Sequence, residues 1–190
     1  MKKIVLISAA VLFGALAGFA QPKFAHINMN EVVQLMPEMD QARTAMNESS
    51  KAAQETYQEM VTEFNTKYQQ YQQKASSWTD AIRASKEKEL TEFQQRIQEF
   101  QESVQGELQQ QQQQLMAPIY KKANETVTSI AKAGGYVYVF DIASLLYVDA
   151  AQSVDITPEA RKALGIAEDR TLEALQAELQ AQAQAQQKAE

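Results

Sequence analysis

The sequence QETYQEMVTEFNTKYQQYQQK, residues 54–74, lies in a stretch from about Met39 to Ile130 whose apolar residues recur every eleven positions. One such row in the first half is Ala42, Ala53, Phe64 and Ala75, and one in the second half is Ile97, Leu108, Ile119 and Ile130. Residues spaced by 4, 3 and 4 positions stay on one face of an α-helix. An eleven-residue period therefore predicts two long helices that are nearly straight or slightly right-handed.

The two apolar faces meet if the chain folds back near Asp80 and Ala81, which predicts an antiparallel helical hairpin. The facing pairs are then Tyr71–Leu90, Tyr68–Phe93, Phe64–Ile97, Tyr57–Val104, Ala53–Leu108, Met46–Leu115 and Ala42–Ile119. Asp80 is the expected N-cap of the returning helix. Almost all other positions are polar, so the hairpin has no second face to bury and is expected to stand out into solvent. Each arm would be roughly 60 Å long.

Composition excludes several classes of function. The 190 residues include no cysteine and one histidine, His26, and their formal net charge is -6. Without cysteine there is no disulfide, thiolate metal site or cysteine nucleophile. The acidic balance argues against a nucleic-acid-binding protein, which would carry a basic stripe. No nucleophile–base pair, phosphate loop or metal cluster is visible in the sequence, so we expect neither an enzyme nor a cofactor or metal ion.

The N-terminus, residues 1–20, has the pattern of a cleavable secretory signal peptide. It opens with two lysines, continues with an apolar run and ends with Gly18-Phe19-Ala20, whose small residues suit the signal peptidase. We expect cleavage before Gln21, with cleavage after Ala17 as the alternative. An uncleaved anchor is a further alternative, although the apolar run is short for a membrane-spanning helix. The mature chain is then exported, without stable membrane insertion.

Three short strands are predicted outside the hairpin, at Phe24–Met29, Tyr136–Phe140 and Leu145–Val148. His26 is expected to be a strand residue whose ring is hydrogen-bonded. A later helix is expected to begin at Thr157 with its hydroxyl as the N-cap, because proline follows at the first turn.

Proline and glycine mark the expected boundaries. Pro37 separates a brief early helix from the first long arm. Pro118 is expected to kink or restart the second arm where it meets the body, and Gly134-Gly135 ends that helix. The chain is thus divided into a signal peptide (1–20), a β body (21–38 and 118–165), a helical hairpin (39–117) and an Ala/Gln-rich tail (166–190).

The order of these elements resembles that of the Skp/OmpH family of periplasmic chaperones. The residues that carry the resemblance are Ile27-Asn28-Met29, Met36-Pro37-Glu38, Leu115 with Pro118-Ile119, Gly135-Tyr136-Val137-Tyr138-Val139 with Asp141, and Asp155-Ile156-Thr157. The resemblance implies an α+β fold, in which a long hairpin, or coiled-coil tentacle, projects from a small β body that assembles into a trimeric barrel. It also implies a periplasmic protein of a Gram-negative bacterium that holds unfolded outer-membrane proteins between the tentacles without ATP.

Two sets of candidate residues follow. Client contacts are expected at Met60, Tyr71, Lys74, Trp78, Arg83, Lys86 and Lys88, on the arms and at the mildly positive hairpin end. The tyrosines and methionines have a second interpretation as the hairpin's own seam, and Trp78 as its cap. Oligomer contacts are expected at Phe24, Ile27, Met29, Tyr136, Tyr138, Phe140, Leu146 and Val148, because three short strands leave open edges. The chain is acidic where the best-known family members are basic, so no lipopolysaccharide site is inferred.

A structural or adaptor coiled coil of the cell envelope is the alternative function. It predicts one fixed partner recovered in stoichiometric amount, whereas a holdase chaperone recovers many clients in small amounts.

Overall fold

The structure is a computed structural model that describes residues 22–189. The expected signal peptide and its cleavage site therefore lie outside the described residues. In chain order the elements are β1 (Lys23–Ile27), α2 (Met29–Leu35), α3 (Pro37–Lys74), the 3-10 turn η1 (Ala75–Ser77), α4 (Asp80–Gly134), β2 (Tyr136–Asp141), the 3-10 turn η2 (Ile142–Ser144), β3 (Ser153–Asp155), α5 (Thr157–Ala163) and α6 (Leu172–Ala189).

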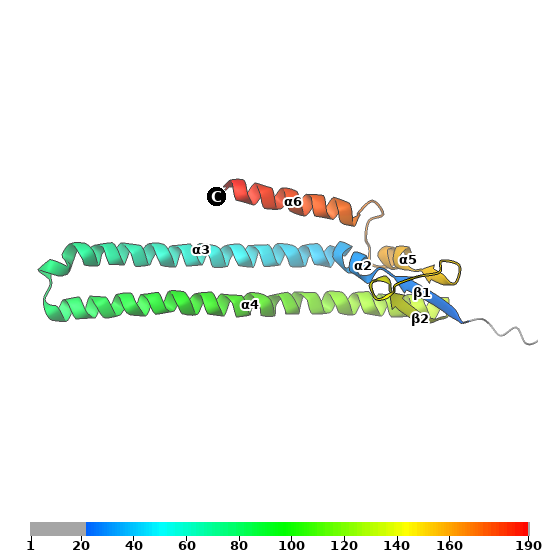
Figure 1. The fold of residues 1–190 in the computed structure, drawn as a ribbon, viewed down its shortest axis with the longest axis horizontal. Coiled ribbons are helices and arrows are strands. Elements are labelled where there is room, and N and C mark those ends of the chain that lie inside the picture. The colour runs from blue at the N-terminus through cyan, green and yellow to red at the C-terminus, as the bar shows by residue number, and fades with distance from the viewer. Residues whose placement is uncertain (1–21, 190) are drawn as a thin grey trace, which may run out of the picture.

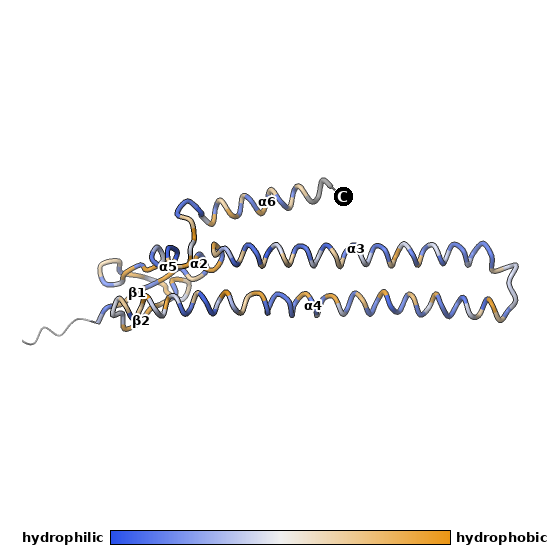
Figure 2. The backbone as a smooth tube through the Cα atoms, turned by 180° about the vertical axis from the view of Figure 1, so that it is seen from behind, coloured by the Kyte–Doolittle hydropathy of each residue, from blue (hydrophilic) through white to orange (hydrophobic). Residues whose placement is uncertain are grey.

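The long helices α3 and α4 form an antiparallel hairpin that projects from a small body at one end (Figure 1). At 1.5 Å per residue they are about 57 Å and about 80 Å long. Figure 2 shows mainly hydrophilic arms with apolar residues at intervals, as one stripe per helix requires. The predicted α+β fold with a helical hairpin on a small β body is confirmed.

Local sequence signals set the helix boundaries. Met36 is extended, at φ -62° and ψ 139°, so α2 ends there and Pro37 begins α3. Gly135 has φ 68°, a left-handed conformation that favours glycine, and it ends α4 as predicted. The predicted N-cap of α4 is wrong by one residue. Thr79 is the cap, and its hydroxyl accepts a hydrogen bond of 3.4 Å from the Ile82 amide.

Predicted facing residues lie together along the hairpin: Tyr71 and Leu90 line one pocket near the turn, and Tyr57 and Val104 line another in the middle. Ser49 Oγ lies 2.9 Å from Gln111 Nε2, within one residue of the predicted pairing. Farther out, the Phe64 ring contacts Phe93, with centroids 6.2 Å apart, one turn away from the predicted Ile97. The chain turns through residues 75–79, just before the predicted fold-back point at Asp80 and Ala81.

Pro118 does not restart the helix, because α4 is continuous from Asp80 to Gly134. Proline removes one helical hydrogen bond and crowds the preceding turn. The ring lies on the exposed side of α4, while Ile119 and Ala123 on the other side are buried in the body core. Packing on both sides of Pro118 thus holds one continuous helix.

The sheet is parallel, with strand order β2-β1-β3. Ala25 and Ile27 of β1 point into a core that α2, α4 and α5 complete, with Val32, Leu35, Ile130, Ile156 and Ala160 among its buried residues. His26 is on the other face of β1, where Nδ1 lies 2.9 Å from Ser153 Oγ, so the prediction of a hydrogen-bonded ring is confirmed.

Two predictions about the body are wrong. Leu145–Val148 is not a strand, and the third strand is Ser153–Asp155 instead. The Asp141 side chain accepts a hydrogen bond of 3.2 Å from the Ala143 amide, and the resulting turn leads the chain away from β2. Thr157 does not cap its own helix. Its hydroxyl accepts a hydrogen bond of 2.9 Å from the Asn28 amide and so links α5 to the start of α2.

The C-terminal segment is joined to the body at its root. Ile166 and Leu175, which the sequence division placed in the tail, are both buried in the core. Among residues 22–189, no helix combines the length and apolar character needed to cross a membrane.

Gly106, in the exposed middle of α4, offers a test of the hairpin. A Cβ placed there meets no atom within 4 Å, and the backbone is helical. We expect Gly106→Ala to raise the free energy of unfolding by about 0.5–1 kcal/mol, because alanine restricts the unfolded chain and favours helix. Gly135→Ala is the matched control and should destabilise by about 1–2 kcal/mol, because its φ is positive. Urea unfolding followed by circular dichroism measures both. A destabilising Gly106→Ala would show that α4 is not regular there.

Candidate functional site

The seam between α3 and α4 covers only part of its apolar side chains. Phe93 is 4% exposed, with the Phe64 ring on one side and the Arg96 guanidinium carbon 4.6 Å from its centroid. Elsewhere in the seam, Met60 and Phe100 are half-buried and Tyr68 is 45% exposed. The arms therefore present polar side chains interrupted by partly covered aromatic, aliphatic and thioether groups. This is a surface suited to many weak contacts.

The hairpin end, which we call the tip (residues 67–90), is held by an aromatic pair and an arginine. The Tyr71 and Trp78 rings meet edge to face, with centroids 5.9 Å apart. Arg83 donates hydrogen bonds of 3.3 Å to the Ala75 carbonyl and 3.5 Å to the Trp78 carbonyl. These contacts favour the interpretation of Trp78 as the cap of the hairpin. The Tyr71 hydroxyl donates to the Glu87 carboxylate, and this bond raises the tyrosine pKa.

A second cluster at the tip joins the two arms by charge. The Glu89 carboxylate accepts hydrogen bonds of 2.7 Å from Lys86 and 2.9 Å from Lys67. These two ammonium groups lower the Glu89 pKa to about 2, and Glu89 in turn raises the Lys67 pKa. The groups are solvent-exposed, so this cluster sets the local charge geometry more than the stability.

The structure gathers some of the predicted client-contact residues and separates others. Tyr71, Lys74, Trp78 and Lys86 line one small pocket of about 230 Å³ at the tip. Arg83 supports this pocket through the Trp78 carbonyl. Lys88 instead pairs with Glu92 at 3.6 Å, and Met60 lies three helical turns closer to the body. The tip has five basic and three acidic residues, which makes it positive in a chain of net charge -6.

The body exposes aromatic and aliphatic side chains on β2 and the loop after it. Tyr138 stacks on Phe24 at a centroid distance of 6.3 Å and also contacts Phe140. Tyr138 is 59% exposed, and Leu146 is fully exposed. Sequence reasoning missed the other exposed apolar residues of this region, which are Val137, Ile142, Tyr147 and Val154.

The remaining oligomerisation candidates are less accessible. Ile27 is 2% exposed and belongs to the core of the chain itself, while Met29 and Tyr136 pack against that core. Val148 is half-buried. The strand alternation of β1 could have separated Phe24 from Ile27 at the sequence level, because their side chains point to opposite faces.

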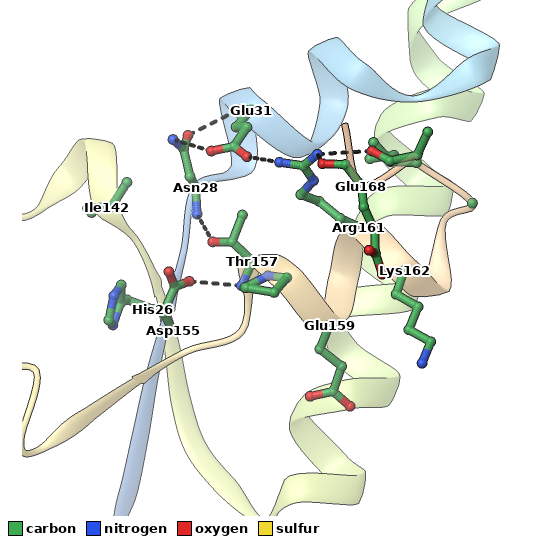
Figure 3. A pocket seen from close by; sticks show the side chains of 14 residues that line it. His26, Asn28, Glu31, Ile142, Asp155, Thr157, Glu159, Arg161, Lys162 and Glu168 are labelled. Carbon is green, nitrogen blue, oxygen red and sulfur yellow. Dashed lines mark hydrogen bonds and ion pairs between the residues drawn. The ribbon is translucent and has the colours of Figure 1, made fainter. Parts of the chain in front are cut away.

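One pocket of the body lies among contacts that join its elements. It has a volume of about 940 Å³ and lies where β1, α2 and α5 meet (Figure 3). Part of its lining is paired: Arg161 donates to Glu31 at 2.7 Å, and Asp155 accepts from the Thr157 amide at 2.9 Å. Within the part of the chain that the structure describes, no group of three or more acidic or histidine side chains is placed to hold a metal ion.

The sequence comparison decides the family. The model of the family described as "Outer membrane protein (OmpH-like)" matches residues 23–164, from the first described strand through the end of α5. The chain belongs to the OmpH-like family. The match spans both arms, the three strands and α5, so the shared unit is the hairpin together with its sheet.

Individual relatives agree with this assignment. The chain is 24% identical over 163 residues to the chaperone protein Skp of Yersinia enterocolitica, an alignment that covers 85% of this chain and 98% of that protein. A crystal structure described as an OmpH-like outer membrane chaperone from Caulobacter crescentus superposes with a TM-score of 0.68 at 14% identity, covering 77% of this chain and 86% of that one. The OmpH-like family is thus a family of chaperones rather than of enzymes.

The Glu89 cluster gives a pH prediction. We expect the Glu89 carboxyl to titrate at about pH 2 in a carboxyl-carbon NMR experiment, and Lys86→Ala to move this titration up toward the usual value of 4.5. A lowered carboxyl pKa contributes stability above the pKa of the unfolded chain and loses it as the pH falls toward 2. Lys88→Ala is the control, because Lys88 pairs with Glu92. An equal response of Glu89 to both substitutions would contradict the cluster.

Proposed function

We propose that this OmpH-like chain is a periplasmic holdase that keeps unfolded outer-membrane proteins from aggregating, without ATP. The observation that supports it is the hairpin itself, which projects from the body with one partly covered apolar seam and a polar outer surface. Several such hairpins on one oligomeric body would bound a solvated cage. The Skp name of the Yersinia relative and the chaperone description of the Caulobacter structure point in the same direction.

The cage would hold clients by enclosure and by many weak contacts. Half-buried methionine and tyrosine side chains, such as Met60 and Tyr71, can adapt to clients of different sequence. The positive tip would attract acidic segments, although salt screens this attraction over about 8 Å at physiological ionic strength. Release then follows when the client binds something else more tightly, because a chaperone without an energy source can only shift equilibria.

The proposal also includes a homotrimer assembled through the body. The exposed side chains of β2 and its following loop are more apolar than a soluble monomer needs, and the outer edges of β2 and β3 are unpaired among the described strands. Tyr138, Phe140 and Leu146 are the contacts that fit this role best. Three copies is the number that the family resemblance implies.

Aggregation of an unfolded client tests the function. A urea-unfolded outer-membrane β-barrel protein is diluted into buffer, and light scattering is followed with an equimolar amount of oligomer and no ATP. We expect the full-length protein to suppress scattering. A variant in which a short turn replaces residues 54–107 should not, although it folds and oligomerises. Ala53 and Leu108 line the same inter-arm pocket, so the shortened hairpin can close. Equal protection by the shortened protein would refute the cage, and no protection by either protein would favour the adaptor function.

Leu146 tests the assembly. It is fully exposed in the single chain, so Leu146→Asp should change the stability of the protomer by less than about 0.5 kcal/mol. If Leu146 lies in the oligomer contact, the same substitution should raise the dissociation constant at least about tenfold. Sedimentation equilibrium measures this, with Ile82→Asp at the tip as the control. A folded wild-type monomer at micromolar concentration would exclude the proposed assembly.

A further inference from the structure

The helix α6 lies beyond the segment that matches the OmpH-like family, and its root is firmly attached. The family match ends at residue 164, and α6 begins at Leu172. The Arg170 guanidinium contacts both carboxylate oxygens of Asp40, at 2.6 and 2.7 Å. Arg161 donates to the backbone carbonyls of Ala167 and Arg170 at 3.1 and 2.6 Å. The first residues of the tail are therefore fixed against α3 and α5.

The contacts of α6 with the rest of the chain decrease from its first turn toward its C-terminus. Leu172, Leu175 and Leu179 are spaced to share one helical face. Leu175 is 4% exposed in the core, whereas Leu179 is 36% exposed, and the side chains described after it are exposed. Figures 1 and 2 show α6 running in the same direction as the arms but standing away from them. The distal half is mostly alanine and glutamine, with no further large apolar residue.

Leu179 forms one wall of an apolar groove at the base of the arms. The groove has a volume of about 450 Å³ and is lined by Met39, Met46, Leu115, Met116 and Tyr120 together with Leu179; we call it the methionine groove. Methionine side chains are flexible and polarisable, so they fit apolar groups of different shapes. Leu179, near the middle of α6, thus borders a surface that can accept other apolar residues.

We propose that α6, through Leu179, is a tethered cover of the methionine groove, which an apolar segment of an unfolded client displaces. The proposal rests on the holdase function. Leu179 continues the contact that Leu175 makes with the core, so docking extends an existing interface by one helical turn. An isolated helix of this length is marginal in water, so the distal half depends on this contact. The root stays attached through Arg170 and Asp40 when the distal half leaves.

The client chemistry suits the groove. Strands of outer-membrane β-barrels alternate apolar and polar residues, so an extended segment can place every second side chain between the methionines. When α6 covers the groove, the apparent client affinity equals the intrinsic affinity multiplied by the fraction of chains in which the groove is free. The tail therefore sets a minimum affinity for client binding. Short or weakly apolar client segments bind the methionine groove too weakly to displace α6.

Distance measurements test the docking in the full-length chain. The protein has no cysteine, so Gln41→Cys and Gln182→Cys place one spin label on exposed α3 and one on distal α6. Labelled chains are diluted into unlabelled wild-type chains, so that only distances within one chain are recorded. We expect a narrow distance distribution that Leu179→Gln broadens. Ala177→Gln, on an exposed position of α6 outside the groove, should leave it narrow. Equal distributions in the two variants would overturn the docking.

Addition of the unfolded client tests the displacement. Binding is recorded separately, by fluorescence anisotropy of a dye-labelled client. We expect bound client to broaden the wild-type distribution as Leu179→Gln does, and Leu179→Gln to bind client about threefold to fivefold more tightly, with Ala177→Gln unchanged. A client that binds without changing the distances overturns displacement and leaves the holdase function intact. If no client binds, the holdase function and the displacement both fail, while the comparison of variants without client still decides the docking.

Discussion

The single apolar stripe on each long helix is the constraint on which the structure depends. Such a helix can bury its stripe only once, and α3 and α4 bury theirs against each other. No apolar face is left for a third layer, so the hairpin remains slender along its whole length. The same stripes continue into the body, where Ala42, Ile119 and Ala123 are buried. Seam and core are thus one continuous interface, and the arms are fixed only at their roots.

Features that depend on local periodicity or on one special residue could be predicted from the sequence. The helical hairpin follows from the eleven-residue period, and its boundaries follow from Pro37 and Gly135. Features that depend on residues far apart in the sequence could not be predicted in this way. Leu145–Val148 has strand propensity, but the turn after Asp141 leads it away from β2. Arg170 and Asp40 are 130 residues apart in the sequence, and neither carries a local signal for their ion pair.

The candidate site shows the same division. Tyr71 and Trp78 meet because both flank the turn, and the position of that turn depends on backbone contacts of Arg83 rather than on a glycine. The positive charge of the tip was visible in the sequence, but the clustering of Lys67 and Lys86 around Glu89 required the register. The groove at the base of the arms includes Leu179, whose spacing from Leu175 marks an apolar face of α6 but does not show which surface that face packs on.

The parallel sheet has a consequence for how the chain folds. His26 and Ser153, on adjacent strands, are separated by 127 residues, and β1 has both of its neighbours beyond the hairpin. Joining such distant segments is entropically costly and slow, but zipping of the arms from their turn brings the roots together and shortens the effective loop. The order of assembly is then turn, arms, sheet. Until the last strand is added, the first has an unpaired edge, so an incompletely folded chain exposes the kind of strand edge that promotes aggregation.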